Sequence, residues 1–137
     1  MTKHYFIATL CALVIYLILD GIWLGIIAKD SYQSALKGML RDNYPMTPWV
    51  VFYLVYAFAI AHLIIIPHLN VTSVMPVLFS GFILGLAAYG AYNLTNYAVL
   101  KGWPLSITLK DLAWGSVAGG AGSAIAWYAT RFIISKI

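Results

Sequence analysis

The feature that most constrains this chain is a long stretch without charge: no Lys, Arg, Asp or Glu occurs between Asp42 and Lys101. A second apolar run, from Tyr5 to Ile27, holds a single charged residue, Asp20. Each apolar stretch of roughly 20 residues can cross a bilayer as one helix. Only 9% of the 137 residues are charged and 63% are hydrophobic, whereas soluble domains carry about 25% charged residues. The sequence therefore predicts an integral membrane protein.

Proline residues and short polar turns divide the chain into four predicted spans. Pro67 ends the second span, and the run Lys101-Gly102-Trp103-Pro104 ends the third. The first span resembles a signal peptide at its start, but its apolar run is too long and no small-residue cleavage site follows, so we expect it to be retained. We predict an all-α membrane protein, a four-transmembrane-helix bundle forming one domain over residues 1–137, with spans at about 5–27, 49–66, 74–100 and 108–131.

The connection from Lys29 to Thr47 contains a helical pattern of apolar residues. Asp30 can cap its start, and Pro45 prevents its continuation. The pattern predicts a short amphipathic helix in the membrane interface between spans one and two, with a plain polar loop as the alternative. The apolar positions follow the spacing of one helix face: Tyr32, Ala35, Leu36, Met39 and Leu40.

Four spans place both termini and the turn at His68 on one side of the membrane, and the other two connections on the opposite side. The termini side holds Lys3, Arg131 and Lys136, and the opposite side holds Lys29, Lys37, Arg41, Lys101 and Lys110. The positive-inside rule therefore favours cytoplasmic connections, with dual insertion as the alternative. The net charge is +4. Because these basic residues flank membrane spans, we expect the lipid bilayer, and no nucleic acid, as their partner.

Small residues in the third and fourth spans predict close helix packing. Gly115 and Gly119 form a GxxxG pair, and Gly81 and Gly85 form a second. Such pairs let two backbones approach closely in a membrane. We expect them to meet within one chain, with a contact across a dimer as the alternative.

Polar groups gather at one end of the predicted bundle. Asp20 lies inside the first span, where a carboxylate costs at least ~2.5 kcal/mol, so it should face the interior and find a donor. The other three spans bring tyrosine, asparagine, tryptophan and aspartate side chains to the same depth. We therefore predict a polar pocket that opens toward the two longer connections. Its candidate ligand-binding residues are Asp20, Trp23, Tyr53, Tyr56, Tyr89, Tyr92, Asn93, Asn96, Lys101, Asp111 and Trp114.

Several of these residues have simpler alternative roles. Asp20 could be a structural tether bonded to Asn93 or Asn96, the tryptophans could form an interfacial belt, and Lys101 could anchor lipid phosphate. Two Asp-x-x-Trp segments, Asp20 to Trp23 and Asp111 to Trp114, fall on helices that are not equivalent halves of a repeat.

No metal or cofactor is expected from the side chains that could bind one. Cys11 is the single cysteine, so neither an intrachain disulfide nor a cysteine cluster can form. His4, His62 and His68 all fall near the termini side, but no two have the spacing of ligands on one helix.

Four sequence segments resemble the signature of a bacterial inner-membrane family of unknown function. They are Leu19-Asp20-Gly21-Ile22-Trp23-Leu24-Gly25, Tyr89 to Asn96, Leu100-Lys101-Gly102-Trp103-Pro104 and Asp111 to Gly115. The resemblance covers nearly the whole chain and implies a four-span, multi-pass protein of the bacterial inner (cytoplasmic) membrane. It implies no activity. In that family an Asp often stands at the position of Asn93, which puts in doubt any mechanism that needs two carboxylates in the pocket.

Three functions fit these residues. The first is transport or permeation of a small polar solute or ion, with Asp20 on the pathway. Four short helices enclose little volume, so a homo-oligomer, a dimer or larger, would form the path. The second is an accessory or structural membrane subunit, in which the polar residues fix helix register. The third and least favoured is a membrane-embedded enzyme on a lipid substrate, with Asp20 and Asp111 at the reaction centre and Lys101 on a phosphate.

Overall fold

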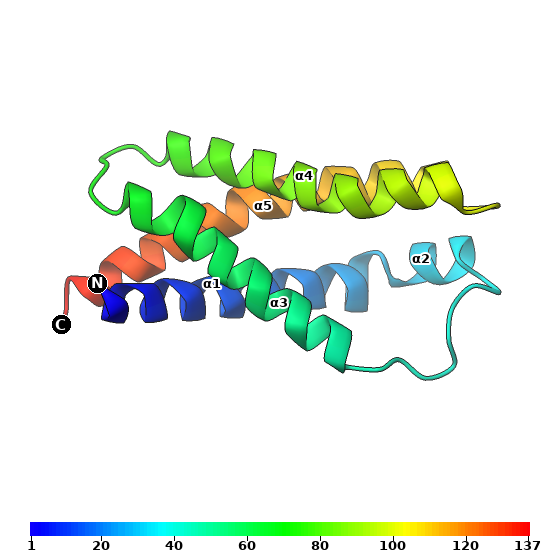
Figure 1. The fold of residues 1–137 in the computed structure, drawn as a ribbon, viewed down its shortest axis with the longest axis horizontal. Helices are drawn as coiled ribbons and strands as arrows, with labels where there is room; N and C mark the ends of the chain where they lie inside the picture. Colours follow the sequence, from blue (N-terminus) through cyan, green and yellow to red (C-terminus); the bar gives the residue numbers. More distant parts are fainter.

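The computed structural model describes residues 1–137, and the chain is helical between its connections (Figure 1). Helix α1 (Thr2–Ile22) continues into the π-helical turn η1 (Trp23–Ile27), and the short helix α2 (Lys29–Ala35) follows. Helix α3 (Thr47–Ile60) continues through η2 (Ala61–Ile65) and η3 (Ile66–His68). The chain ends with α4 (Met75–Val99) and α5 (Leu105–Ile134).

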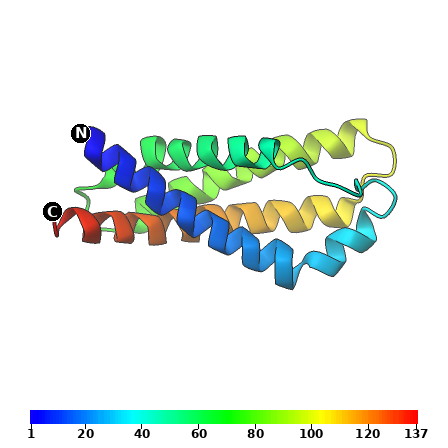
Figure 2. The same ribbon diagram turned by 90° about the horizontal axis from the view of Figure 1, so that it is seen from below.

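The four long helices alternate in direction. Both termini and the turn between α3 and α4 gather at one end, whereas α2 and the connection between α4 and α5 lie at the other (Figures 1 and 2). This is the arrangement of ends that the sequence predicts. We refer below to the termini end and the connection end.

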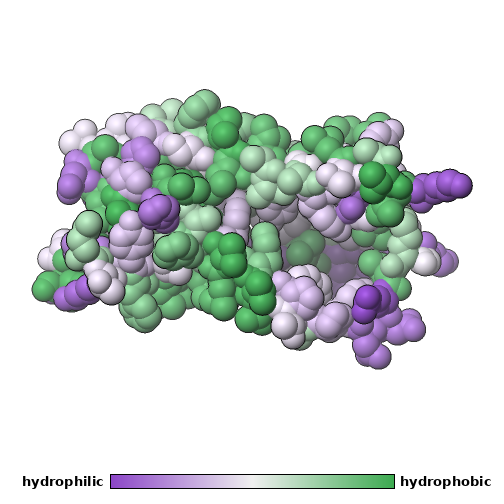
Figure 3. Space-filling view, in the orientation of Figure 1, coloured by the Kyte–Doolittle hydropathy of each residue, from purple (hydrophilic) through white to green (hydrophobic).

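Three continuous helices are long and apolar enough to cross a membrane: Thr2–Ile27, Thr47–His68 and Met75–Val99. Their outer faces expose large hydrophobic side chains such as Phe79, which is 68% exposed, and Val55, which is 64% exposed. Figure 3 shows hydrophobic residues over the middle of the molecule and hydrophilic ones toward its two ends. Exposure of such a surface to water is unfavourable, whereas the lipid tails of a bilayer would cover it. The chain therefore has the surface of a membrane protein.

Helix α5 contains the fourth predicted span, 108–131, but is less apolar than the other three. Its 30 residues include a run of Gly and Ser, together with Lys110 and Asp111. It contributes more buried residues than any other helix, so its small and polar side chains face protein. The helix extends beyond the predicted span at both ends, and its composition reflects burial among the other helices.

Helices α4 and α5 pack with their backbones in contact through the predicted glycines. A Cβ atom added to Gly85 would lie 2.0 Å from the carbonyl oxygen of Gly115, and one added to Gly81 would lie 2.3 Å from that of Gly119. No side chain fits at either contact. The two small-residue pairs therefore meet within one chain, as expected.

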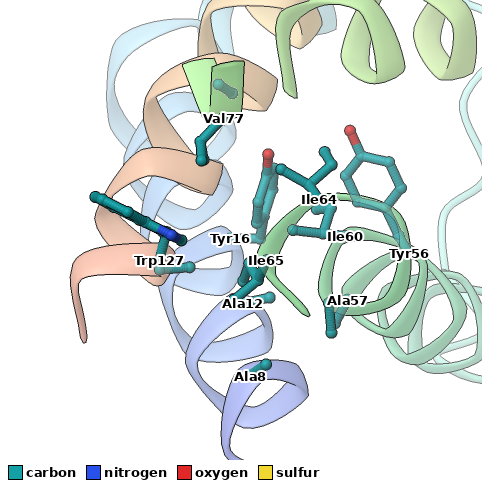
Figure 4. Packing of buried hydrophobic residues seen from close by; sticks show 13 residues of the cluster. Ala8, Ala12, Tyr16, Tyr56, Ala57, Ile60, Ile64, Ile65, Val77 and Trp127 are labelled. Atoms are coloured by element: carbon teal, nitrogen blue, oxygen red, sulfur yellow. The ribbon is translucent and has the colours of Figure 1, made fainter. Parts of the chain in front are cut away.

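The hydrophobic core occupies the termini half of the bundle (Figure 4). Tyr16, Ile60, Ile64 and Trp127 are among its fully buried side chains. The hydroxyl of Tyr16 donates to the carbonyl of Gly119 at 2.9 Å, which satisfies a polar group inside an apolar environment. Aromatic and aliphatic side chains thus close this half of the bundle.

The predicted amphipathic helix is shorter than expected. Helix α2 ends at Ala35, and Gly38 has a φ of +86°, a conformation that non-glycine residues rarely adopt. Leu36 is buried, whereas Met39 and Leu40 are 46% and 38% exposed. The helical face was therefore predicted correctly through Leu36, and its extension to Leu40 was wrong because the chain turns at Gly38.

Candidate functional site

Asp20 lies where the four long helices meet. It is 5% exposed, and each of the other three long helices supplies one donor to its carboxylate. Tyr53 of α3 donates to Oδ2 at 2.7 Å, and Tyr89 of α4 approaches the same oxygen at 3.4 Å. The indole Nε1 of Trp114, on α5, donates to Oδ1 at 2.9 Å. Asp20 thus faces the interior of the bundle, as predicted. Its donors are phenol and indole groups instead of Asn93 or Asn96.

Asp111 forms a second buried carboxylate, 7% exposed, near the connection end of α5. Tyr32 of α2 donates to its Oδ1, and the side-chain amide of Asn93, on α4, donates to its Oδ2. The same amide nitrogen also donates to the main-chain carbonyl of Tyr89 at 3.1 Å. Burial, followed by the hydrogen bond to Asp111, raises the pKa of Tyr32 above its ordinary value. Tyr32 therefore stays protonated and acts as a donor.

Two stacked indoles connect the carboxylates. The rings of Trp23 and Trp114 have centroids 4.5 Å apart and an interplanar angle of 1°. Trp114 donates to Asp20, and Trp23 donates to the hydroxyl of Tyr32 at 3.3 Å. We call the set Asp20, Trp23, Tyr32, Tyr53, Tyr89, Asn93, Asp111 and Trp114 the carboxylate cluster.

Local backbone features position this cluster. Trp23 begins the π-helical turn η1, and wider turns of this kind frequently occur at functional sites. Gly115 leaves room for the ring of Tyr89, because a Cβ there would lie 2.2 Å from Tyr89 Cγ. Helix α2 is held against α5 by a further bond from Lys110 Nζ to Ser31 Oγ, at 2.8 Å.

Four residues of the predicted site lie outside these hydrogen bonds. Tyr56 is buried in the adjoining core, edge-on to Tyr16 with ring centroids 5.2 Å apart, and its hydroxyl has no partner. Tyr92 is 55% exposed and packs on Trp103. Asn96 is half-buried on α4, and Lys101 is exposed on the turn before α5.

Sequence reasoning missed two contributors from the first connection, Tyr32 and Ser31, and it gave Lys110 no role in the site. The signal for Tyr32 was present: it occupies the apolar face of the predicted amphipathic helix beside Leu36. A tyrosine on such a face brings a hydroxyl to whatever the helix covers, which here is Asp111.

The molecular surface is hollowed toward the connection end. Figure 3 shows a recess between the connection-end halves of α3 and α4, with both hydrophilic and hydrophobic residues inside it. Inside the cluster the side-chain oxygen of Asn93 is buried and has no hydrogen-bond partner. An unpaired buried acceptor is costly, so this oxygen is available to a donor or a cation that enters the site.

A family model described as "Predicted membrane protein (DUF2177)" matches residues 5–128. The chain belongs to this family. No curated protein and no solved structure shows detectable similarity to the chain. The predicted resemblance to a membrane protein family of unknown function is thus confirmed. All residues of the carboxylate cluster fall within the matched segment of this DUF2177 protein.

The electrostatics of the cluster follow from its donors, which are phenol, indole and amide groups without charge. Such donors satisfy the carboxylate oxygens without bringing a positive charge to them. Two buried carboxylates without a positively charged partner favour a cation beside them. No group of three or more His, Cys, Asp and Glu side chains is placed to hold a metal ion.

Proposed function

We propose that this protein is a four-span membrane protein that binds a small polar solute or ion, foremost a cation, at the carboxylate cluster and mediates its passage across the membrane. A bacterial inner membrane is the location that we propose for it. The observation that carries the proposal is the pair of buried carboxylates, Asp20 and Asp111, whose donors are uncharged. Ionisable residues kept inside a membrane bundle commonly mark solute or proton pathways.

Helix α5 is the fourth span in this proposal. At 1.5 Å per residue its 30 residues extend about 45 Å, more than the roughly 30 Å of a hydrocarbon core. Its backbone contacts that of α4 at two places separated by one helical turn, Gly81 with Gly119 and Gly85 with Gly115. A helix packed in this way along a membrane span lies at the same depth as that span.

The cluster sits toward the connection end, and the hydrophobic core around Tyr16 and Trp127 closes the other half of the bundle. A solute that reaches Asp20 therefore cannot continue through a rigid single chain. Passage requires movement of the helices or a path formed between copies. We propose a homo-oligomer, a dimer or larger, as the working assembly.

A binding screen tests the site first. Detergent-purified protein is melted in the presence of inorganic cations, amines, nucleosides and sugars, with the Asp20→Asn and Asp42→Asn variants in parallel. Asp42 is exposed in the first connection, so it is a matched control for the loss of one negative charge. A ligand of the cluster should stabilise the wild type and Asp42→Asn, but not Asp20→Asn, by an amount that grows with its concentration.

Flux into proteoliposomes then tests transport of the solute that the screen identifies. We expect Asp20→Asn and Asp111→Asn to abolish uptake while Asp42→Asn preserves it. Unchanged uptake by Asp20→Asn at every pH would refute the pathway. If no compound separates the variants and Asp20→Asn itself melts early, the cluster serves packing alone.

One observation favours the second candidate, an accessory or structural subunit. A single carboxylate, Asp20, receives donors from α3, α4 and α5, so it ties all four long helices together. Under this function Asp20→Asn would weaken folding or subunit association, and no ligand would respond. An enzyme on a lipid substrate has less support, since Lys101 lies on an exposed turn outside the cluster.

A further inference from the structure

A cavity of about 370 Å³ lies at the termini end, far along the bundle from the carboxylate cluster. The start of α1, the turn after η3 and the end of α5 converge around it. Its polar lining consists of His4, Asn70, Arg131 and Ser135, and its apolar lining includes Ile66, Leu69 and Ile134.

The charged side chains of this end all have the same sign. The four acidic residues of the chain are Asp20, Asp30, Asp42 and Asp111, and all of them belong to the connection end or the carboxylate cluster. Lys3, Arg131 and Lys136 lie at the termini end, where no aspartate or glutamate side chain occurs. The cavity thus offers donors and positive charge, with no acidic side chain to balance them.

Arg131 is fixed in place before any ligand binds. Its guanidinium carbon lies 4.3 Å from the ring centroid of Trp127, and Nη1 donates to the carbonyl of Val71 at 3.0 Å. Trp127 is itself held by a bond from Nε1 to the carbonyl of His68 at 2.7 Å. A guanidinium carries five N–H donors, so this one bond leaves most of them for an anion. Arginine in such a position recognises phosphate through paired hydrogen bonds.

We infer that this cavity binds the phosphate of an anionic phospholipid from the surrounding bilayer. Arg131, with His4 and Asn70 as further polar groups, receives the phosphate, and the apolar wall of Ile66, Leu69 and Ile134 receives the adjoining acyl chain. The end of a membrane helix is the depth at which phospholipid headgroups lie. A zwitterionic headgroup fits less well, because its ammonium group would meet a positive lining.

The test is thermal melting of the detergent-purified full chain with phosphatidylglycerol, phosphatidylcholine or inorganic phosphate. Phosphatidylglycerol should raise the melting temperature of the wild type more than phosphatidylcholine does. Arg131→Gln should weaken the apparent affinity for phosphatidylglycerol by about tenfold or more, the effect of losing charge-assisted hydrogen bonds. Lys136→Gln is the matched control, since Lys136 lies at the same end but does not line the cavity. It should respond as the wild type does.

A second variant covers the case in which Arg131→Gln fails to fold. Ser135→Trp keeps the arginine and places a large side chain in the cavity that Ser135 lines. The loss of the hydroxyl should be tolerated, because it bonds only the nearby carbonyl of Phe132. This variant should lose the preference for phosphatidylglycerol. Equal responses to the two lipids, or a wild-type response from both cavity variants, would overturn the inference. Full stabilisation by inorganic phosphate alone would overturn the assignment to a lipid.

Discussion

The indole of Trp114 donates a hydrogen bond to Asp20 and stacks in parallel on the indole of Trp23, three residues after that aspartate. Trp23 in turn donates to Tyr32, which donates to Asp111. Each Asp-x-x-Trp segment therefore supplies an indole donor to the carboxylate of the other segment, Trp114 directly and Trp23 through the hydroxyl of Tyr32. Residues three apart on a helix share a face, so the spacing points each Asp and its Trp into the same interface between α1 and α5.

Replacement of the tryptophans should separate the two roles of the stacked pair. Trp114→Phe removes a donor to a buried carboxylate, which should lower the free energy of unfolding by about 1.5–3 kcal/mol. Trp23→Phe removes a donor to a neutral hydroxyl and should cost less, about 0.5–1.5 kcal/mol. Unfolding in mixed micelles measures both. Trp49→Phe, at a 48% exposed site, is the control and should change stability by about 0.5 kcal/mol or less. Equal losses in all three variants would contradict the network.

The two phenols on Asp20 should differ in their coupling to it. Tyr53 lies 2.7 Å from Oδ2, a normal hydrogen bond, whereas Tyr89 lies 3.4 Å away. A double-mutant cycle of Tyr53→Phe with Asp20→Asn should give a coupling energy of about 1–3 kcal/mol. The cycle with Tyr89→Phe should give a smaller one. A ligand that binds Asp20 and draws Tyr89 closer would raise the second coupling toward the first, so both cycles are repeated with any ligand that the screen identifies.

The contact between α4 and α5 should be intolerant of a single methyl group. Gly85→Ala would place Cβ 2.0 Å from a main-chain oxygen, which cannot move without separating the helices. We expect a loss of about 2 kcal/mol or more in the free energy of unfolding. Gly21→Ala, on α1, is the matched control because nothing lies within 4 Å of its added Cβ. That variant should be neutral or slightly stabilised, since Ala favours helix by about 1 kcal/mol over Gly.

The sequence was sufficient to predict the long helices, their order and the end at which polar groups gather. Proline and glycine at the breaks and the absence of charge in between are local signals, so they need no knowledge of packing. The sequence could not assign the hydrogen-bond partners within the carboxylate cluster. Helices α1 and α3 are apolar on nearly every side, so periodicity does not reveal which face meets which neighbour. The pairing of Asp20 with Trp114, and of Asn93 with Asp111, depends on helix rotation, which packing alone determines.

The hydroxyl of Tyr32 should lose its proton at higher pH than that of an ordinary tyrosine. Its burial and its bond to Asp111 raise its pKa above the ordinary value of 10.0. The folded state therefore keeps the proton that the unfolded state loses, so the stabilisation from Tyr32 is complete below pH 10 and is lost as the pH rises above it. The absorbance at 295 nm of the wild type minus that of Tyr32→Phe isolates this residue. The difference should develop at higher pH than in a tyrosine model compound, and coincident curves would contradict the docking of α2 on α5.

Asn93→Asp should make the stability of the cluster depend on pH. The amide of Asn93 now donates to the carboxylate of Asp111, and an ionised aspartate in its place could only accept. Two adjacent buried carboxylates cannot both ionise without strong repulsion, so one must hold a proton. A protonated carboxyl group at this position can donate as the amide does. We therefore expect Asn93→Asp to melt near the wild type at about pH 5 and to lose stability as the pH rises toward 8.

Asn93→Leu is the matched variant for this prediction, because it removes the donor without adding a charge. It should lose stability by a similar amount at every pH, since Asp111 keeps only the bond from Tyr32. Melting curves of both variants and the wild type between about pH 5 and 8 test whether the side chain at position 93 contacts Asp111. Parallel pH dependence of the two variants would mean that the side chain at position 93 does not contact Asp111. A slope confined to Asn93→Asp would establish that the contact exists within the folded bundle.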